Sequence, residues 1–515
     1  MAKLRDWLEY NPVELTFGTS GLRGLVTDMT DLECYINAVG FLRFLAQAGG
    51  LQKDSLVYLA GDLRHSTPRI LRAVHQAITD SGYKTLYCGL IPTPAVAYAA
   101  LQKGVPCIMV TGSHIPDDRN GIKFYKATGE VLKDDEAAIR EAVGAVRQQI
   151  YASETASFTQ KGMLVQKPNL PPEEKLALQL YIQRYTDVFD ATTFAGKKIV
   201  FYQHSAVGRD SLVAILQALG AKVVSVGRSE KFVPIDTENI TPDDQAYFKV
   251  LAAQYPDAFA IVSTDGDSDR PFVIDEHGVF HRGDVLGAVV ADWLQADFAA
   301  LPISSSDAVD QHLTDRHVRW QHTRIGSPYV ISVMEEAVRG GSKRAVGWEV
   351  NGGLLLGCNV KINGKTLKAL PTRDALLPII GALLTATQQN KPVSAIFNEL
   401  PKRFTQAGLI NDFPMQVSRQ ILQRFSLDTP EVRAELQAVF NAKQGFGALT
   451  AINTIDGIRM FFDNGDIAHL RPSGNAPQLR IYSVANTQER ADQIVAMAIA
   501  EPNGIFRSLQ AFVEK

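Results

Sequence analysis

Three carboxylates alternate along residues 264–270, which read Thr-Asp-Gly-Asp-Ser-Asp-Arg and follow the apolar stretch 259–262. Acids at alternate positions beyond a strand can converge on one point, where a hard cation such as Mg²⁺ relieves their repulsion. Asp265, Asp267 and Asp269 are therefore candidate metal ligands. An EF-hand loop, a phosphatase with an aspartate nucleophile and a solvated turn are alternatives for this segment alone. Arg270, standing where an EF-hand has glycine, and the strand-like sequence after it disfavour the EF-hand.

A serine stands in a similar place in the segment 111–116, Thr-Gly-Ser-His-Ile-Pro, which follows the apolar run 107–110. A side chain at the end of a strand is held in a loop that a ligand can approach. Ser113 is thus a candidate nucleophile, and His114 and Lys123 offer a proton or a positive charge nearby. For a lone Ser-His pair, a polar turn is the ordinary interpretation.

Three further segments offer groups that bind phosphate or sugar. Residues 17–24 (Phe-Gly-Thr-Ser-Gly-Leu-Arg-Gly) and 471–477 (Arg-Pro-Ser-Gly-Asn-Ala-Pro) combine backbone N–H groups, hydroxyls and a guanidinium, which together suit phosphate. The first could equally be a tight turn. Residues 347–353 (Gly-Trp-Glu-Val-Asn-Gly-Gly) could present the Glu349 carboxylate and the Asn351 amide to sugar hydroxyls.

The elements that must position these segments repeat one pattern of strand, polar loop, amphipathic helix and strand. The pattern occurs at 55–89 and 197–227, and more weakly at 301–326. Short β-branched runs alternating with helices predict mixed or parallel α/β sheets, and the recurrence suggests three related units. Chance similarity among generic α/β segments is the alternative.

Changes in this pattern divide the chain into four predicted domains. We expect α/β domains at 1–165, 166–282 and 283–400, and a smaller C-terminal α+β domain at 401–515. The last rests on a hairpin-like sequence at 457–474 and a closing helix at 487–500. A length of 515 residues also favours several domains over one.

The composition of the chain disfavours several classes of partner and location. The chain has 52 Lys and Arg against 55 Asp and Glu, a net charge of −3, so we expect neither a nucleic acid nor a membrane as partner. The first fifteen residues hold no apolar signal region. The four cysteines are scattered without metal-ligand spacing, which predicts buried free thiols and a cytoplasmic protein.

Taken together and in order, these segments resemble the motifs of the α-D-phosphohexomutase family, which includes phosphomannomutase/phosphoglucomutase. The family's Gly-Thr-Ser-Gly-Leu-Arg-Gly matches 18–24, and its phosphoserine loop Thr-Ala-Ser-His-Asn-Pro matches 111–116. Its Asn-Gly-x-Lys, Asp-Gly-Asp-x-Asp-Arg and Arg-Pro-Ser-Gly-Thr-x-Pro motifs match 120–123, 265–270 and 471–477. The resemblance covers nearly the whole chain.

The resemblance implies four domains around a central cleft and an isomerase that moves a phosphoryl group within a hexose phosphate, mannose or glucose. Ser113 would carry the phosphoryl group, and a 1,6-bisphosphate would be intermediate and activator. Implied catalytic residues are Ser113, His114, Lys123 and Arg23. Ligands of Mg²⁺ would be Ser113, Asp265, Asp267 and Asp269. Implied substrate-binding residues are Ser20, Arg270, Glu349, Asn351, Arg471, Ser473, Gly474, Asn475 and Arg480.

The sugar-recognition segment departs most from the family. Phosphomannomutase/phosphoglucomutase members commonly read Gly-Glu-x-Ser-Gly-His there, whereas this chain has Asn351 for the serine and Gly353 for the histidine. The Lys or Arg that family members often carry near the position of Gly326 has no clear counterpart, because Ser327 and Pro328 occupy that loop. A phosphoglucosamine mutase, a non-catalytic phosphosugar-binding paralogue and a phosphatase therefore remain alternatives. The oligomeric state and the preferred hexose are left open by the sequence.

Overall fold

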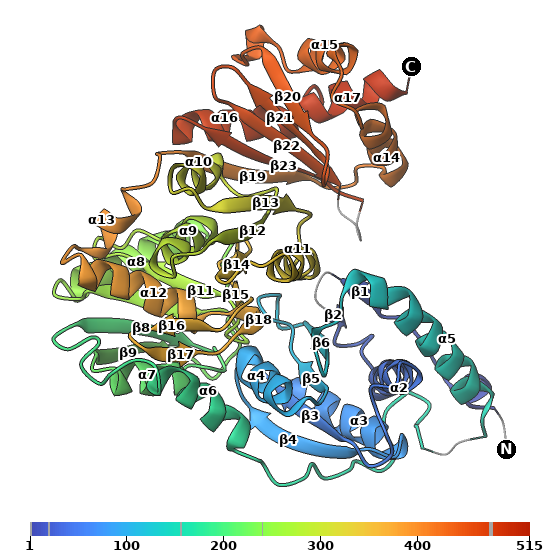
Figure 1. The fold of residues 1–515 in the computed structure, drawn as a ribbon. Helices are drawn as coiled ribbons and strands as arrows, with labels where there is room; N and C mark the ends of the chain where they lie inside the picture. Colours follow the sequence, from blue (N-terminus) through green and yellow to red (C-terminus); the bar gives the residue numbers. More distant parts are fainter. Residues whose placement is uncertain (1–2, 19–20, 155–156, 239, 473–476, 515) are drawn as a thin grey trace. The chain divides into compact units, whose positions relative to one another are not determined.

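The computed structural model describes residues 3–18, 21–154, 157–238, 240–472 and 477–514. The chain forms two compact units, one of Met1–Ala299 with Gly326–Phe397 and one of Ala300–Ile325 with Asn398–Lys515. Figure 1 shows α/β sheets in the first unit and an antiparallel sheet with helices in the second. The three predicted strand–helix–strand patterns and the C-terminal hairpin and helix are all present.

The first sheet of the first unit has the order β1-β2-β6-β5-β3-β4, with β7 beside β6. Strand β3 is parallel to β4 and β5, while β6 is antiparallel to β5 and β2. The strands are β1 Thr16–Gly18, β2 Gly21–Leu25, β3 Leu56–Gly61, β4 Lys84–Leu90, β5 Cys107–Val110, β6 Arg119–Lys126 and β7 Gly129–Glu130. This pairing brings the ends of β3 and β5 and the side chain of Lys123 on β6 to one place.

Helices flank this sheet, and their ends follow ordinary capping rules. They are α1 Leu4–Trp7, α2 Asp31–Gln47, α3 Thr67–Asp80, α4 Thr93–Lys103, the 3₁₀ turn η1 Lys133–Asp135 and α5 Glu136–Ala152. The hydroxyl of Thr30 accepts the N–H of Glu33 and begins α2, and Gly104 ends α4 in the left-handed conformation. Apolar side chains of α2, α3 and α5 pack with β3 and β5 in one core.

The second sheet has the order β11-β10-β8-β9, in which β10, β8 and β9 are parallel and β11 is antiparallel to β10. Its elements are α6 Leu176–Thr186, β8 Lys198–His204, α7 Ser211–Ala218, β9 Lys222–Arg228, α8 Pro242–Gln254, β10 Ala260–Thr264 and β11 Pro271–Ile274. The six residues between β10 and β11 are the acidic segment. It is therefore a strand-to-strand turn, which excludes the EF-hand.

The remaining part of the first unit holds the neighbouring antiparallel strands β14 Ala345–Trp348, β15 Leu354–Leu356 and β18 Leu370–Asp374 and the ribbon β16 Val360–Ile362 with β17 Lys365–Leu367. Its helices are α9 Gly283–Trp293, α11 Ser327–Arg339, α12 Leu376–Gln388 and α13 Val393–Phe397. A Cβ at Gly287 would lie 2.4 Å from the Trp348 ring, so only glycine lets α9 approach β14 this closely.

The second unit is built on the antiparallel order β19-β23-β22-β21-β20. Its elements are α10 Asp307–Asp315, β13 Arg319–Thr323, β19 Phe404–Ile410, α14 Met415–Arg424, α15 Pro430–Val439, η2 Ala442–Gln444, β20 Leu449–Asn453, β21 Ile458–Phe462, β22 Ile467–Pro472, β23 Leu479–Ala485, α16 Gln488–Ile499 and α17 Ile505–Val513; β12 Phe298–Pro302 spans the boundary of the units. One face of the sheet packs with α14, α15, α16 and α17 in a single core.

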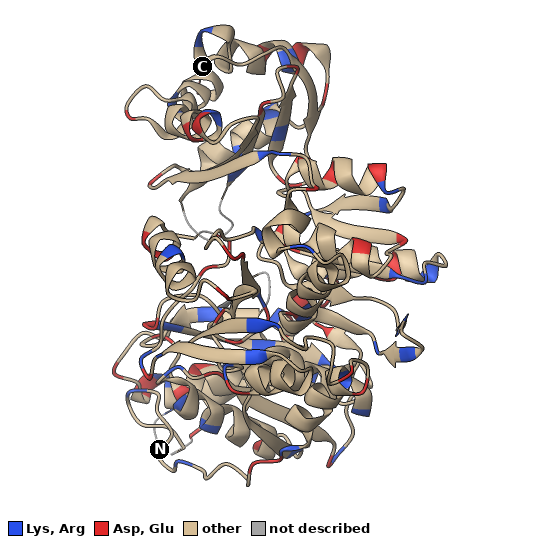
Figure 2. Cartoon of the chain, turned by 90° about the vertical axis from the view of Figure 1, so that its left-hand side faces the viewer, with Lys and Arg blue, Asp and Glu red and all other residues tan. Residues whose placement is uncertain are grey.

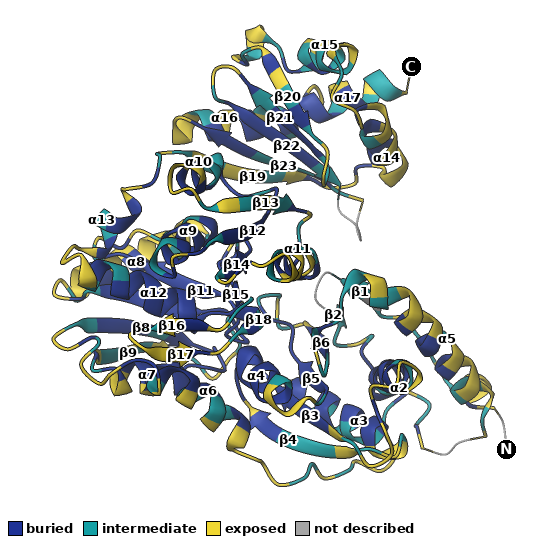
Figure 3. Cartoon of the chain, viewed as in Figure 1, coloured by how far each residue is buried: buried dark blue, intermediate teal, exposed yellow. Residues whose placement is uncertain are grey.

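Burial follows this architecture. Figure 3 shows the central strands mostly buried and the outer faces of the helices mostly exposed. Acidic and basic residues are interspersed over both units, in keeping with the net charge of −3 (Figure 2). In the described part of the chain, no helix combines the length and the apolar character that crossing a bilayer requires. Three of the four cysteines are buried, and none forms a disulfide.

Candidate active site

Ser113 lies in the loop after β5, almost fully buried, with a left-handed φ of 56°. This conformation is unusual for a residue with a side chain and marks a loop held by its surroundings. The Ser113 N–H donates to Thr111 Oγ1 (2.8 Å), and its Oγ donates to Asp265 Oδ2 (2.6 Å). The candidate nucleophile is thus joined directly to the acidic segment, which stands 152 residues later in the chain.

Arg64, which follows β3, holds the carbonyl groups of the Ser113 loop. Its guanidinium donates to the carbonyls of Ser113 (3.0 Å), Ile115 (2.5 Å), Pro116 (2.7 Å) and Arg119 (3.0 Å). A Cβ at residue 112 would meet this guanidinium at 2.6 Å, which explains glycine there in place of the family's alanine. Four charge-assisted hydrogen bonds from one buried side chain thus fix the carbonyls of the loop.

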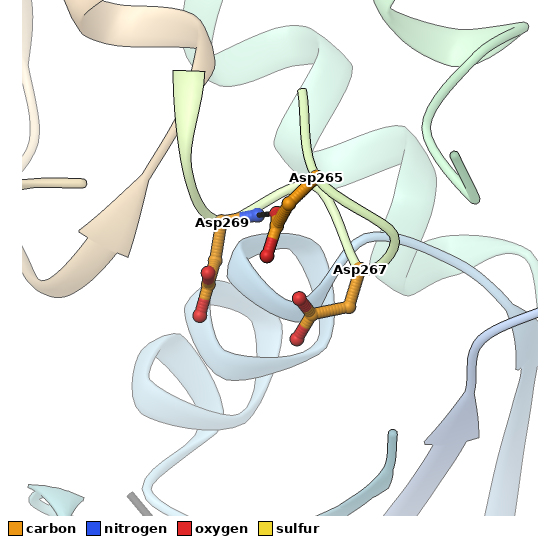
Figure 4. A group of neighbouring side chains, drawn as sticks. All are labelled: Asp265, Asp267 and Asp269. Atoms are coloured by element: carbon orange, nitrogen blue, oxygen red, sulfur yellow. Dashed lines mark hydrogen bonds between the residues drawn. The ribbon is translucent and has the colours of Figure 1, made fainter. Parts of the chain in front are cut away.

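The acidic segment forms a tight turn that is stabilised by hydrogen bonds within the segment. Asp265 Oδ1 accepts the backbone N–H groups of Asp269 and Arg270 (3.2 Å each), and Ser268 has a φ of 59°. One carboxylate oxygen of each aspartate lies within 4.8 Å of those of the other two, and all three residues are buried. Figure 4 shows the three side chains pointing to the same side of the turn.

Neighbouring groups donate hydrogen bonds to one oxygen of Asp267 and of Asp269 and leave the other oxygen without a hydrogen bond. Asp267 Oδ2 accepts Thr93 Oγ1 (2.5 Å) and Lys123 Nζ (2.7 Å). Asp269 Oδ2 accepts Lys123 Nζ (2.6 Å) and Arg373 Nε and Nη2 (3.1 Å each). The Oδ1 atoms of both aspartates are buried without a hydrogen bond. Buried oxygens of this kind call for a ligand, and a hard divalent cation fits them.

The three aspartates are not electrostatically equivalent. Burial, and then the charges of Asp267 and Asp269, raise the pKa of Asp265 well above its usual range. For Asp269, burial acts in the same direction, but Arg373, Lys123 and Arg270 outweigh it and hold the pKa far below the usual value. The raised pKa of Asp265 thus reflects crowded carboxylates, whose mutual repulsion a bound cation would relieve.

Three predicted cations surround the turn. Lys123 forms ion pairs with Asp267 and Asp269, and Arg270 Nε lies 3.8 Å from both Asp265 Oδ2 and Asp269 Oδ1. Burial, followed by the charges of Arg270 and Arg373, lowers the pKa of Arg23 on β2 to about 10. These cations concentrate positive charge around Ser113, as the approach of a phosphate group requires.

His114 lies beside Ser113, with its Nδ1 3.3 Å from Ser113 Oγ. Burial, and then the neighbouring charges of Arg270 and Arg23, hold the pKa of His114 far below its ordinary value. The imidazole is thus neutral, and its protonated form is strongly disfavoured.

The sugar-recognition segment adjoins this site through side chains. Glu349 Oε2 accepts Arg373 Nη1 (2.9 Å), and Arg373 in turn binds Asp269. Asn351 Nδ2 donates to Glu238 Oε1 (3.2 Å), and Asn351 Oδ1 accepts the N–H of Gly353 (3.0 Å). The predicted residues Glu349 and Asn351 therefore belong to one hydrogen-bonded loop.

The second unit carries the other predicted phosphate site. Arg471 on β22 and Arg480 on β23 are direct register partners, so both side chains leave the same face of the sheet, opposite the apolar core. Arg471 Nε donates to Asp456 Oδ1 (3.1 Å). The predicted residues Ser20, Ser473, Gly474 and Asn475 lie outside the described residues.

Sequence reasoning missed three residues that complete the site. Arg64, Thr93 and Arg373 contact the Ser113 loop or the aspartates, although no motif contains them. For two of these residues the sequence did contain an indication of their role. Arg64 follows the end of a strand, and Arg373 with Asp374 interrupts an apolar sequence, where buried charges must be paired.

Comparison with known proteins agrees with this geometry. Models of the phosphoglucomutase/phosphomannomutase family match four segments in order: alpha/beta/alpha domain I at 14–149, domain II at 179–278, domain III at 282–404 and the C-terminal domain at 425–501. Together these segments span most of the chain and establish three α/β domains followed by a C-terminal domain.

Individual relatives are similar to this chain over nearly their whole length. Phosphomannomutases of Salmonella muenchen and Sinorhizobium fredii are each 40% identical over 491 residues, covering 95% of this chain and 96% and 98% of their own. The structure of a phosphoglucomutase/phosphomannomutase family protein from Burkholderia thailandensis superimposes with a TM-score of 0.68 at 17% identity, covering 96% of this chain and 97% of that one.

Proposed function

The chain belongs to the phosphoglucomutase/phosphomannomutase family, and we propose that it interconverts hexose 1-phosphates and hexose 6-phosphates, with mannose or glucose as the sugar. The observation that carries the proposal is the contact of Ser113 Oγ with Asp265, within a loop whose carbonyls Arg64 holds. A serine joined to a buried acidic turn and surrounded by Lys123, Arg270 and Arg23 suits phosphoryl transfer.

In the proposed reaction, Ser113 carries a phosphoryl group that passes to the free hydroxyl of a hexose monophosphate. The bond between phosphorus and Ser113 Oγ breaks as a bond to the sugar oxygen forms, and the hydroxyl proton leaves to a base. The product is a hexose 1,6-bisphosphate. The bisphosphate then turns around, and the phosphoryl group at its other end is transferred to Ser113 by the reverse step. The sugar leaves as the isomeric monophosphate, and the serine is phosphorylated again.

His114, whose Nδ1 lies beside Ser113 Oγ, and Lys123 are the two residues to which we assign proton transfer in this scheme. Lys123, Arg270 and Arg23 balance the negative charge of the transferred group. Because the phosphoserine would bear nearly two negative charges next to three carboxylates, these cations are needed before a second phosphate can approach.

The donor set fits Mg²⁺. Asp265, Asp267, Asp269 and the oxygen on Ser113 would hold it, and the buried Oδ1 atoms of Asp267 and Asp269 are the vacant acceptors. When bound, Mg²⁺ supplies positive charge to the oxygens of the phosphoryl group.

The rest of the substrate is assigned to two other loops. We assign Arg471 and Arg480, together with Ser473, Gly474 and Asn475, to the phosphate that is not being transferred. Glu349 and Asn351 are assigned to the sugar hydroxyls, and Ser20 to the substrate phosphate. Arginine pairs suit this role because the guanidinium fork binds phosphate at two points.

Several finer features complete the proposal. The domains are 1–165, 166–282, 283–400 and 401–515, and a hexose 1,6-bisphosphate serves as activator that phosphorylates Ser113. Three buried free cysteines support a reducing, cytoplasmic location. A phosphosugar is the partner, and neither nucleic acid nor membrane is expected.

³¹P NMR tests the reaction. The protein is mixed with Mg²⁺ and a trace of hexose 1,6-bisphosphate, and mannose, glucose and glucosamine 1-phosphates are supplied in separate tubes. We expect the 6-phosphate to form without inorganic phosphate, fastest with mannose or glucose. Fastest turnover of glucosamine 1-phosphate would identify a phosphoglucosamine mutase, and inorganic phosphate alone a phosphatase. No change in any tube would indicate a binding protein.

A further inference from the structure

Arg373 is a charged side chain that touches both the acidic turn and the sugar-recognition loop. Its Nε and Nη2 donate to Asp269 Oδ2, and its Nη1 donates to Glu349 Oε2. The side chain is 2% exposed. A planar fork with fixed donor directions sets the positions of both carboxylates at once, which a flexible ammonium cannot do.

The contacts of Arg373 also determine which oxygen of Asp269 stays available. Arg373 and Lys123 both donate to Oδ2, while Oδ1 is buried without a hydrogen bond. Rotation of the carboxylate would exchange these roles, and the three donors on Oδ2 oppose that rotation. Arg373 and Lys123 thus keep Asp269 Oδ1 free of hydrogen bonds, with Arg270 Nε 3.8 Å away.

Gly353 leaves the space that Arg373 occupies. A Cβ at this position would lie 2.6 Å from Cδ, 2.7 Å from Cγ and 2.9 Å from Cβ of Arg373. These atoms lie near the backbone of β18, so the arginine cannot easily move aside. The φ of Gly353 is not in the left-handed region, so the reason for glycine here is room and not backbone conformation.

We propose that Arg373 is a positioning residue that couples the sugar-contacting Glu349 to the metal-binding Asp269, and that Gly353 is required to seat it. The inference rests on the proposed function, which assigns Glu349 to the sugar and Asp269 to the metal. Movement of Glu349 on binding a sugar then shifts Asp269 through one guanidinium, and cation binding in turn affects Glu349, because coupling between two sites is reciprocal.

Binding of Mn²⁺ alone, followed by calorimetry or electron paramagnetic resonance, tests this inference without turnover. Arg373→Lys keeps the positive charge but cannot bridge both carboxylates, so we expect about tenfold weaker Mn²⁺ binding. Glu349→Gln, which changes a sugar-loop residue, should also weaken Mn²⁺ binding severalfold. Arg147→Lys is the matched control, because Arg147 forms a buried ion pair with Glu33, which is no part of this site, and its Mn²⁺ affinity should stay unchanged.

The outcomes separate the inference from the proposed function. Failure of the unsubstituted protein to bind Mn²⁺ would overturn the proposed metal site itself. Normal binding by both Arg373→Lys and Glu349→Gln would overturn the coupling alone. Tighter binding by Arg373→Met with normal binding by Arg373→Lys would also overturn it, because Arg373 would then act only as a competing cation.

A double-mutant cycle tests the role of Gly353. Gly353→Ala places its Cβ against the Arg373 side chain, so we expect it to weaken Mn²⁺ binding about as much as Arg373→Lys does. In an Arg373→Ala background the same substitution has room and should have little further effect. Equal effects of Gly353→Ala in the two backgrounds would contradict the proposal. Thermal unfolding of each variant confirms that the folded protein is being compared.

Discussion

The Ser113 loop in the first unit and the Arg471 strand end in the second are both proposed phosphate sites, but they are held in different ways. Ser113 is almost fully buried, has a strained backbone and lies among carbonyls held by Arg64. The side chain of Arg471 is 21% exposed and is held by Asp456. The transfer site is fixed before substrate arrives, whereas the second site keeps a solvent-accessible guanidinium.

The difference matches the demands of the proposed reaction. Phosphoryl transfer depends on exact placement of the reacting oxygen, so rigidity at Ser113 raises the rate. The second site must accept a phosphate on either end of the sugar, and a less confined arginine can serve both orientations. Changes at the first site should therefore lower kcat, and changes at the second should raise KM.

The largest effect is expected from Ser113→Ala. Without the hydroxyl there is no oxygen to carry the phosphoryl group, so kcat should fall on the order of 10⁴-fold or more. Initial rates in both directions measure it, and circular dichroism checks the fold. Turnover within tenfold of the unsubstituted protein would remove Ser113 from its role.

Asp267→Asn should have the next largest effect, with kcat lower on the order of 10²–10³-fold and a higher Mg²⁺ requirement. The amide keeps the size of the side chain but has lost the charge of a metal ligand. Rates across a Mg²⁺ titration measure both quantities. Asp275→Asn is the control, since Asp275 binds His281 outside the acidic turn. Equal Mg²⁺ responses in the two variants would argue against the metal site.

Arg64→Lys tests whether the rigidity of the Ser113 loop matters. Lysine keeps the charge beside Asp62 but cannot reach the four carbonyls that the guanidinium holds. We expect kcat to fall about 10- to 100-fold with little change in KM, because Ser113 is displaced while substrate binding persists. Steady-state kinetics with hexose 1-phosphate measure the two constants. A rise in KM alone would show that Arg64 serves binding.

Arg471→Met tests the other side of the comparison. Loss of the guanidinium fork should raise KM about tenfold or more and change kcat less. The same kinetic assay applies, with Arg507→Met as control because Arg507 pairs with Glu501 near the end of the chain. A large loss of kcat at unchanged KM would mean that the two sites are not functionally distinct.

The smallest effect concerns the stability of the second unit. Burial, and next the charge of Arg459, lower the pKa of His469 to about 4 from an ordinary 6.5. As the pH falls, His469 becomes protonated in the unfolded chain at a higher pH than in the folded protein. The free energy of unfolding is therefore highest above about pH 6.5, decreases as the pH drops, and levels off below about pH 4. The loss is about 2 kcal/mol at about pH 5.

His469→Gln removes that titration and keeps a donor for the Asp456 carbonyl. Urea unfolding at about pH 7 and pH 5 should show a smaller loss of stability in the variant than in the unsubstituted protein. An identical pH dependence would contradict the assignment. The experiment also shows whether the second unit unfolds partly in acid. Without it, a loss of activity caused by such unfolding could be mistaken for a titration at the Ser113 site.

Much of this organisation could be predicted from the sequence because motifs and periodicity are local. The strand–helix–strand patterns became β3–α3–β4 and β8–α7–β9, and the Asp265–Asp269 segment became a buried acidic triad beside Ser113. Arg64 and Arg373 could not be assigned, since their roles depend on tertiary contacts made 49 and 104 residues away in the chain. The space at Gly353 likewise exists only in the packed structure.

Phosphorylation of Ser113 is the central step of the proposed reaction, and mass spectrometry of the peptide that contains Ser113 tests it directly. The protein is incubated with Mg²⁺ and hexose 1,6-bisphosphate, and half of it is then treated with excess hexose monophosphate. We predict one phosphoryl group on Ser113 in the first half and its loss in the second. A phosphoryl group at another residue, or one on Ser113 that the monophosphate does not remove, would contradict the account.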